Sequence, residues 1–126
     1  MGIVVRDIEE SLLFFKKTFG ARVLKKYVFE EQNQISVDIA IGDGYIEVMA
    51  PYETGKGGTI EKYLQTHGPG LHHISLRAED FDNDTEALKQ DGVNVFGNVV
   101  MEGRKIAFTH PKTTGGFLFE LLEPAK

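Results

Sequence analysis

Two matching stretches decide the fold: residues 45–51 read Y-I-E-V-M-A-P, and residues 118–124 read L-F-E-L-L-E-P. They lie 73 positions apart, and each carries a glutamate inside an apolar strand pattern and a proline near its end. The same offset carries Asp7 onto Asp80, and both aspartates follow a strand-like segment and precede a helix-like one. A single register shared by features from both ends of each half predicts a duplicated module.

Each half begins with a strand and a helix. Residues 2–6 have the pattern of a buried strand, and Asp7 with Glu10 predicts a capping box for a helix that ends at Gly20. The second half repeats this plan from residue 73 to Gly92. The residues expected on the apolar helix faces are Ile8, Leu12, Phe15 and Phe19 in the first half and Phe81 and Leu88 in the second.

Further strands are expected after each helix, at Ile35–Ile41, Tyr45–Met49, Arg104–Thr109 and Phe117–Leu122. The tripeptide G-D-G at 42–44 predicts a hairpin, and a short helix is expected near residues 60–66. We therefore predict one α+β domain over residues 1–126, with module 1 at about 1–52, a glycine-rich linker at about 53–59 and module 2 at about 60–126.

The composition limits the class of function. A chain of 126 residues is long enough for one domain, and the lack of cysteine leaves His, Asp, Glu or amide oxygen as metal ligands. Nineteen acidic and fourteen basic residues, without a dense Lys/Arg block, disfavour a nucleic-acid partner. With no membrane-length apolar run and no signal-peptide pattern, we expect no membrane partner and a cytoplasmic protein.

Two consecutive histidines, His72 and His73, stand in a strand pattern, so their side chains point to opposite faces. Running the 73-residue offset back from His73 reaches position 0, directly before the first residue, whereas His72 falls further out. The repeat therefore nominates His73 for a site and places His72 on the other side. The alternative is a structural histidine that binds nothing.

Glu47 and Glu120 occupy equivalent positions in apolar strands. A strand with one wet face explains a lone glutamate, but two at equivalent positions favour a shared role. One His and one Glu from each module would form a set suited to Zn²⁺, Co²⁺, Ni²⁺, Mn²⁺ or Fe²⁺. Three of these four ligands are present, Glu47, His73 and Glu120.

Residues 2–20, G-I-V-V-R-D-I-E-E-S-L-L-F-F-K-K-T-F-G, resemble the opening strand and helix of the vicinal oxygen chelate superfamily. This superfamily includes glyoxalase I, bleomycin-resistance proteins and extradiol dioxygenases. More narrowly, I-E-K-Y-L-Q-T-H-G-P-G-L-H-H-I-S-L-R-A-E-D and F-T-H-P-K-T-T-G-G-F-L-F-E-L-L-E resemble the methylmalonyl-CoA epimerase family. The resemblance implies two tandem βαβββ modules that form a cup-shaped mixed β-sheet around a divalent metal, with Glu47, His73 and Glu120 as ligands.

The resemblance also implies a catalytic carboxylate at Asp38, where the family usually has glutamate, and a second acid–base group at Glu120. Without the family, Asp38 is equally well read as a residue on the wet face of a strand. The implied activity is removal and return of the α-proton of a methylmalonyl-CoA-like thioester. The implied partner is an acyl-CoA or related thioester, with no redox cofactor, and we expect a homodimer.

Lys112, with Arg104 and Lys105, is the candidate contact for the phosphates of CoA, although each also reads as a solvated cation. Two alternative functions stay open. One is a glyoxalase I-like lactoylglutathione lyase, which would use nearly the same ligands; the H-P-K-T-T-G-G stretch at 110–116 favours the epimerase. The other is a metal-free binding protein of the bleomycin-resistance type, with solvated carboxylates.

Overall fold

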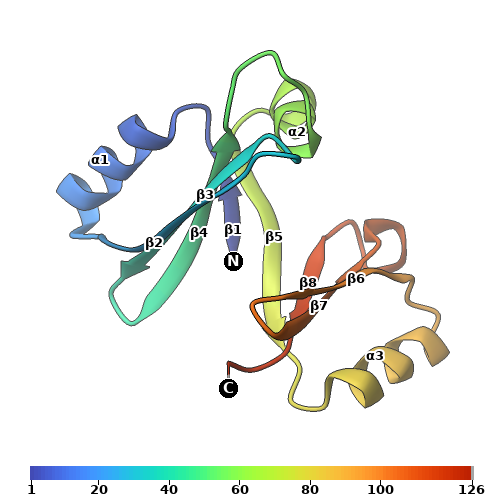
Figure 1. The fold of residues 1–126 in the computed structure, drawn as a ribbon. Coiled ribbons are helices and arrows are strands. Elements are labelled where there is room, and N and C mark those ends of the chain that lie inside the picture. The colour runs from blue at the N-terminus through green and yellow to red at the C-terminus, as the bar shows by residue number, and fades with distance from the viewer. Residues whose placement is uncertain (126) are drawn as a thin grey trace. The chain divides into compact units, whose positions relative to one another are not determined.

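The computed structural model describes residues 1–125, which fall into two compact units, Met1–His72 and a second that starts at His73 (Figure 1). The first contains β1 (Gly2–Val4), α1 (Ile8–Phe19), β2 (Arg22–Phe29), β3 (Gln34–Ile41), β4 (Gly44–Pro51) and α2 (Thr59–His67). Its strands lie in the order β2-β3-β4-β1. β1 runs parallel to β4, and the other neighbours are antiparallel.

The second unit repeats this topology. It contains most of β5 (Gly70–Arg77), whose first three residues belong to the first unit, followed by α3 (Phe81–Gln90), β6 (Val95–Met101), β7 (Arg104–Thr109), the 3-10 helix η1 (Pro111–Thr113) and β8 (Phe119–Leu122). Its strands lie in the order β5-β8-β7-β6, with β5 parallel to β8 and the other neighbours antiparallel. The predicted α+β class with two tandem βαβββ modules is therefore confirmed.

The predicted aspartates cap both module-opening helices. Asp7 Oδ1 accepts a hydrogen bond from the Glu10 backbone N–H at 2.9 Å, and Asp80 Oδ1 accepts one from Asn83 at 3.3 Å. Gly20 ends α1 in the left-handed conformation, with φ 66°. Phe19 was expected on the apolar face of α1 but is 56% exposed: it lies in the last turn of the helix, and its ring contacts Phe14 and Phe15.

Each unit buries one face of its sheet under a helix. In the first unit α1 covers apolar residues of β3 and β4, among them Val37, Ile39 and Val48. In the second unit Phe81 of α3 packs against Ala107 and Leu121. Because side chains alternate along a strand, the intervening residues point to the opposite face of each sheet. That second face carries the candidate site residues.

The glycine-rich stretch at 53–58 is held against the first unit. Asn33 Nδ2 donates to the carbonyls of Glu53 and Gly57 at 2.9 and 2.7 Å. The buried Glu61 carboxylate accepts hydrogen bonds from the N–H groups of Gly55 and Gly57. The predicted short helix is present as α2, and its apolar face, with Ile60 and Leu64, packs on Val4 and Met49.

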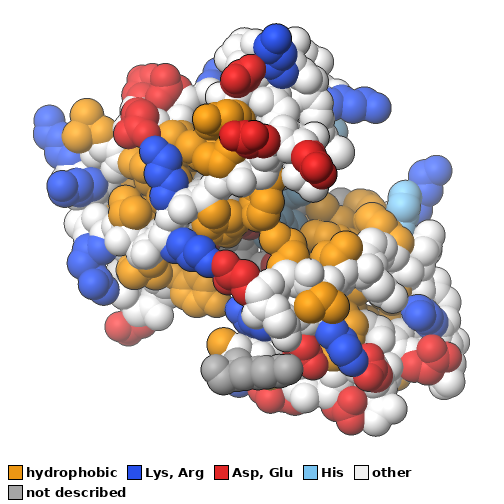
Figure 2. All heavy atoms as spheres, in the orientation of Figure 1, with side chains coloured by type: hydrophobic (Ala, Val, Ile, Leu, Met, Phe, Trp, Pro, Cys, Tyr) orange, Lys and Arg blue, Asp and Glu red, His pale blue; other side chains and the backbone are white. Residues whose placement is uncertain are grey.

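The surface carries mixed charge. On the face shown in Figure 2, basic side chains are interspersed with acidic ones rather than gathered into one block. Exposed pairs such as Lys26 with Glu9 and Arg77 with Glu79 fit this pattern. Among residues 1–125, none of the helices has both the length and the hydropathy that crossing a membrane requires.

Gly58→Ala should lower the free energy of unfolding by about 1 to 3 kcal/mol. Gly58 has φ 93°, and an added Cβ would lie 2.4 Å from the Gln32 carbonyl oxygen, which belongs to the backbone and cannot turn aside. Urea unfolding measures the loss. Gly44→Ala is the matched control, because a Cβ there meets its nearest atom at 3.9 Å. Equal losses from the two variants would contradict the steric explanation.

Candidate functional site

The first unit brings two of the predicted site carboxylates together. Asp38 on β3 and Glu47 on β4 are direct cross-strand partners. Tyr27 of β2 donates its hydroxyl to both, at 3.1 Å to Glu47 Oε2 and 3.3 Å to Asp38 Oδ1. These three residues form the Tyr27–Asp38–Glu47 cluster, which lies on the sheet face that α1 does not cover.

Strand alternation explains this placement. The neighbours of Asp38 along β3, Val37 and Ile39, are 0% and 1% exposed in the core under α1. Asp38 must therefore point away from that core, and its partner Glu47 points the same way. Like charges directly opposite on neighbouring strands destabilise a sheet, so a donor between them relieves part of this cost.

The same surroundings keep Tyr27 protonated. Burial raises the pKa of the Tyr27 phenol well above its usual value, and the negative charges of Glu47 and Asp38 raise it further. The neutral phenol is a hydrogen-bond donor and acceptor, whereas a phenolate could only accept. Tyr27 therefore serves the two carboxylates as a donor across the working pH range of a protein.

The second unit brings together the other predicted site residues. His73 Nε2 on β5 lies 3.9 Å from Glu120 Oε1 on β8. Ser75, two residues along β5, donates its hydroxyl to the same oxygen at 2.9 Å. The ring of Phe108, the cross-strand partner of Glu120 on β7, lies edge-on to His73 with centroids 6.5 Å apart.

His73 is held as a neutral imidazole. Only 5% of the residue is exposed, and this burial lowers the pKa of His73 from 6.5 to about 4. Metals bind the neutral form of histidine, so burial leaves the nitrogen ready for a metal at neutral pH without loss of a proton. The chemistry of His73 with Glu120, and of Glu47 in the first unit, fits a divalent metal with nitrogen and oxygen ligands.

The remaining histidines have other contacts. His72 lies edge-on to Tyr63 of α2, with ring centroids 4.9 Å apart, and His67, the last residue of α2, stacks on the same ring at 4.5 Å. His110 Nδ1 accepts a hydrogen bond from the Lys112 backbone N–H at 3.2 Å. His72 thus packs on a helix, while its neighbour His73 lies beside Glu120 and Phe108.

Neither unit alone brings three His, Asp or Glu side chains together as a metal site within residues 1–125. The three predicted ligands are divided between the units: Glu47 lies in the first, His73 and Glu120 in the second. Their convergence on one ion therefore stays a prediction.

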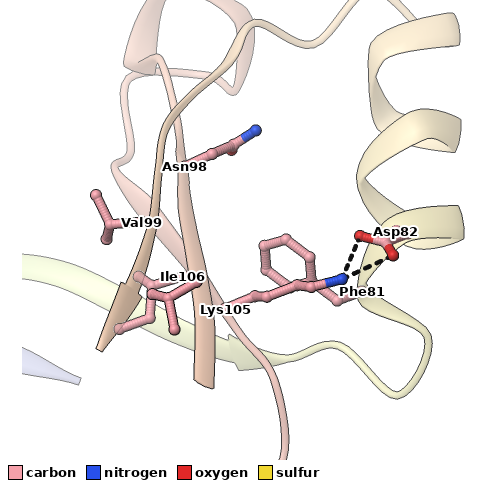
Figure 3. Close-up of a pocket in the computed structure, with 7 residues that line it drawn as sticks. Phe81, Asp82, Asn98, Val99, Lys105 and Ile106 are labelled. Carbon is pink, nitrogen blue, oxygen red and sulfur yellow. Dashed lines mark hydrogen bonds and ion pairs between the residues drawn. The ribbon is translucent and has the colours of Figure 1, made fainter. Parts of the chain in front are cut away.

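The basic residues suggested for CoA have different surroundings. Lys105 Nζ is held by both carboxylate oxygens of Asp82, at 2.9 and 2.8 Å, beside a pocket between α3 and the β6–β7 strands (Figure 3). Arg104 Nε donates to the Glu123 carbonyl oxygen at 2.8 Å. Lys112 lies exposed on η1. Of the three, Lys112 is therefore the one retained as a candidate phosphate contact.

Comparison with known proteins identifies the family to which this chain belongs. Residues 1–108 match the family model described as the Glyoxalase/Bleomycin resistance protein/Dioxygenase superfamily. The chain therefore belongs to this superfamily. This assignment confirms the broader resemblance inferred from the opening strand and helix.

The narrower resemblance is confirmed by individual relatives. The chain is 28% identical to the mitochondrial methylmalonyl-CoA epimerase of Dictyostelium discoideum, over 98% of this chain and 75% of that protein. The crystal structure of methylmalonyl-CoA epimerase from Mycobacterium tuberculosis matches with a TM-score of 0.87 and 28% identity, over 99% of this chain and 85% of that one. A variant of the Streptomyces coelicolor methylmalonyl-CoA epimerase, in complex with 2-nitronate-propionyl-CoA, matches with a TM-score of 0.86 and 29% identity, over 99% and 94%.

Two residues of these clusters were not predicted. Tyr27 lies on β2, a strand that the residue pattern does not predict. Its position beside Asp38 could therefore not be predicted from the sequence. The position of Ser75 is predictable: it lies two residues after His73, so alternation along the predicted strand places both side chains on one face.

Metal-free protein should lose stability as the pH falls from about 6.5 toward about 4. In this window the unfolded state takes up a proton at His73 that the folded state, with its lowered pKa, does not, so the free energy of unfolding decreases. Urea unfolding with a chelator at pH 7 and pH 5, for the wild type and His73→Gln, measures this. If both proteins lose the same amount, His73 is not the group responsible.

Proposed function

We propose that this chain is a metal-dependent epimerase that removes and returns the α-proton of a methylmalonyl-CoA-like acyl thioester. The observation that carries the proposal is the pairing of a candidate base, Asp38, with a candidate metal ligand, Glu47, on the sheet face of the first unit that α1 does not cover. Relatives named as methylmalonyl-CoA epimerases, which match nearly the whole chain, support this substrate class.

Glu47, His73 and Glu120 are proposed to hold the metal. The neutral His73 supplies a nitrogen, and the two glutamates supply oxygens. When bound, a divalent ion contributes Lewis acidity, which stabilises negative charge on the oxygens of the substrate. The ion could be cobalt, zinc, nickel, manganese or iron, because this donor set suits each of them.

Asp38 is proposed as the base on one side of the α-carbon. Its carboxylate lies on the sheet face opposite α1, and Tyr27 fixes the orientation of Oδ1. Glu120 is proposed as the acid–base group for the other side, with its carboxylate oriented by the Ser75 hydroxyl. Two such groups permit a proton to leave one face of the α-carbon and another to arrive on the opposite face.

Lys112 is proposed to contact a phosphate of the CoA moiety, because its exposed position on η1 suits such a contact. The bound acyl-CoA analogue of the Streptomyces coelicolor enzyme supports this ligand class. A homodimer and a cytoplasmic location stay predictions. A lactoylglutathione lyase or a metal-free binding protein would instead give no exchange of the methylmalonyl-CoA α-proton.

His73→Ala should lower the bound metal well below that of the wild type, whereas His72→Ala should leave the stoichiometry nearly unchanged. The reason is that His73 is the buried neutral imidazole beside Glu120, while His72 packs on Tyr63. Elemental analysis of the purified proteins after metal loading measures the ratio. Equal losses would show that His72 also supports the metal and that the assignment of faces is wrong.

Asp38→Asn should reduce α-proton exchange of methylmalonyl-CoA in deuterated water by roughly a hundredfold or more, because the amide keeps the size and removes the basicity. Proton NMR of the substrate follows the exchange. Asp43→Asn, an exposed aspartate in the β3–β4 turn, is the control and should exchange at the wild-type rate. Normal exchange by the Asp38 variant would place the base elsewhere, and no exchange by metal-loaded wild type would refute the epimerase.

A further inference from the structure

The Tyr27 side chain is built into the first unit as a fixed donor. Its ring lies edge-on to Phe29 of the same strand, with centroids 5.2 Å apart, and Lys25 Nζ lies 5.4 Å from the ring centroid. These ring contacts restrict the orientation of the Tyr27 side chain independently of its hydroxyl. The hydroxyl then reaches Asp38 and Glu47 at 3.3 and 3.1 Å.

We propose that Tyr27 is a positioning residue for the epimerase: its one hydroxyl proton is shared between the base Asp38 and the metal ligand Glu47, and so couples the two. The inference rests on the proposed function of the site. It goes further in assigning a role to a residue outside both the ligand set and the acid–base pair.

The strand pairing explains why a donor at this point matters. Asp38 and Glu47 are direct partners on neighbouring antiparallel strands, where facing side chains have Cβ atoms roughly 4.5 to 5.5 Å apart. Two carboxylates at that separation repel each other, and a donor between them offsets part of this repulsion, alongside Lys25, the partner of Asp38 on β2. The phenol satisfies one oxygen of each and keeps both directed to the same side of the sheet.

The sharing follows from the inventory of protons. A phenol has one O–H to donate and an oxygen that can accept. While Asp38 is ionised, the O–H is divided between the two carboxylates. Once Asp38 has taken the substrate α-proton, its new O–H can donate to the phenol oxygen, and the Tyr27 proton then belongs to Glu47 alone. No covalent bond of Tyr27 breaks, and only the hydrogen bonds change direction.

This coupling has a functional consequence. Glu47 receives its strongest hydrogen bond when Asp38 is protonated, which is the moment when the substrate carries its negative charge. A carboxylate that accepts a full hydrogen bond has its orientation fixed, so Glu47 would be held most firmly as a ligand while the substrate carries its negative charge. Tyr27 thus links the protonation of the base Asp38 to how firmly the ligand Glu47 is held.

The test is Tyr27→Phe, which removes the hydroxyl and keeps the ring contacts. We expect kcat for α-proton exchange to fall by roughly ten- to a hundredfold, with KM changed much less, and the affinity of metal-free protein for Co²⁺ to fall about tenfold. Co²⁺ affinity is measured by absorption spectroscopy against a competing chelator. Tyr52→Phe, a 45% exposed tyrosine outside the cluster, is the control and should match the wild type in both measurements.

Two further variants separate positioning from packing. In the Asp38→Asn background, Tyr27→Phe should have little additional effect on exchange, because Tyr27 acts there through Asp38, yet it should still weaken Co²⁺ binding through Glu47. Replacing Tyr27 by 4-aminophenylalanine, which restores an N–H donor on the same ring, should recover much of the lost kcat. Urea unfolding checks that all variants are folded; if the Phe variant is not, the amino variant alone carries the test, and low kcat in it overturns the role.

The two proposals fail in different ways. If metal-loaded wild type does not exchange the α-proton, the epimerase is refuted, while the Co²⁺ titration still tests the link between Tyr27 and Glu47. If the wild type is active and Tyr27→Phe equals it in kcat and in Co²⁺ affinity, the role of Tyr27 is refuted and the epimerase stands. Multiplicative effects of Tyr27→Phe and Asp38→Asn on exchange would also overturn the coupling.

Discussion

The period of two along a β-strand is the constraint on which this structure depends. Because α1 buries Val37 and Ile39, the side chain of Asp38 must point to the opposite face of the sheet. The pairing of β3 with β4 places Glu47 on that same face. A slip of one residue would place both carboxylates under the helix and the apolar residues in the open. The packing of the core and the geometry of the candidate site are therefore fixed by a single register.

The fold was predictable where a local signal coincided with the repeat. Asp7 and Asp80 each cap a helix, and β4 and β8 carry the glutamates from which the offset was read. The edge strands β2 and β6 were not located, because most of their residues are exposed on both faces and no alternation of apolar and polar residues marks them. Helical spacing places Phe19 on the apolar face of α1 but does not reveal that Phe19, in the last turn, lies outside the packed cluster.

The candidate site was predictable in part, for a related reason. His73, Glu47 and Glu120 follow from the repeat, since they occupy strands whose positions the offset preserves. Asp38 came from family resemblance and not from the repeat: the residue that faces Glu120 as Asp38 faces Glu47 is Phe108, 70 positions later instead of 73. The connection from β7 to β8, which contains η1, differs in length from the β3–β4 turn and breaks the offset there.

The aspartate at position 38 and the phenylalanine at position 108 show that equivalent positions of the two modules carry different chemistry. In the first copy the residue facing the glutamate is acidic, and one phenol donates to both carboxylates; in the second copy it is an aromatic ring beside His73. A carboxylate in place of Phe108 would favour the imidazolium, whereas an apolar ring favours the uncharged imidazole. Equivalent positions of the two modules thus carry a hydrogen-bonded carboxylate in the first unit and an apolar ring beside a neutral histidine in the second.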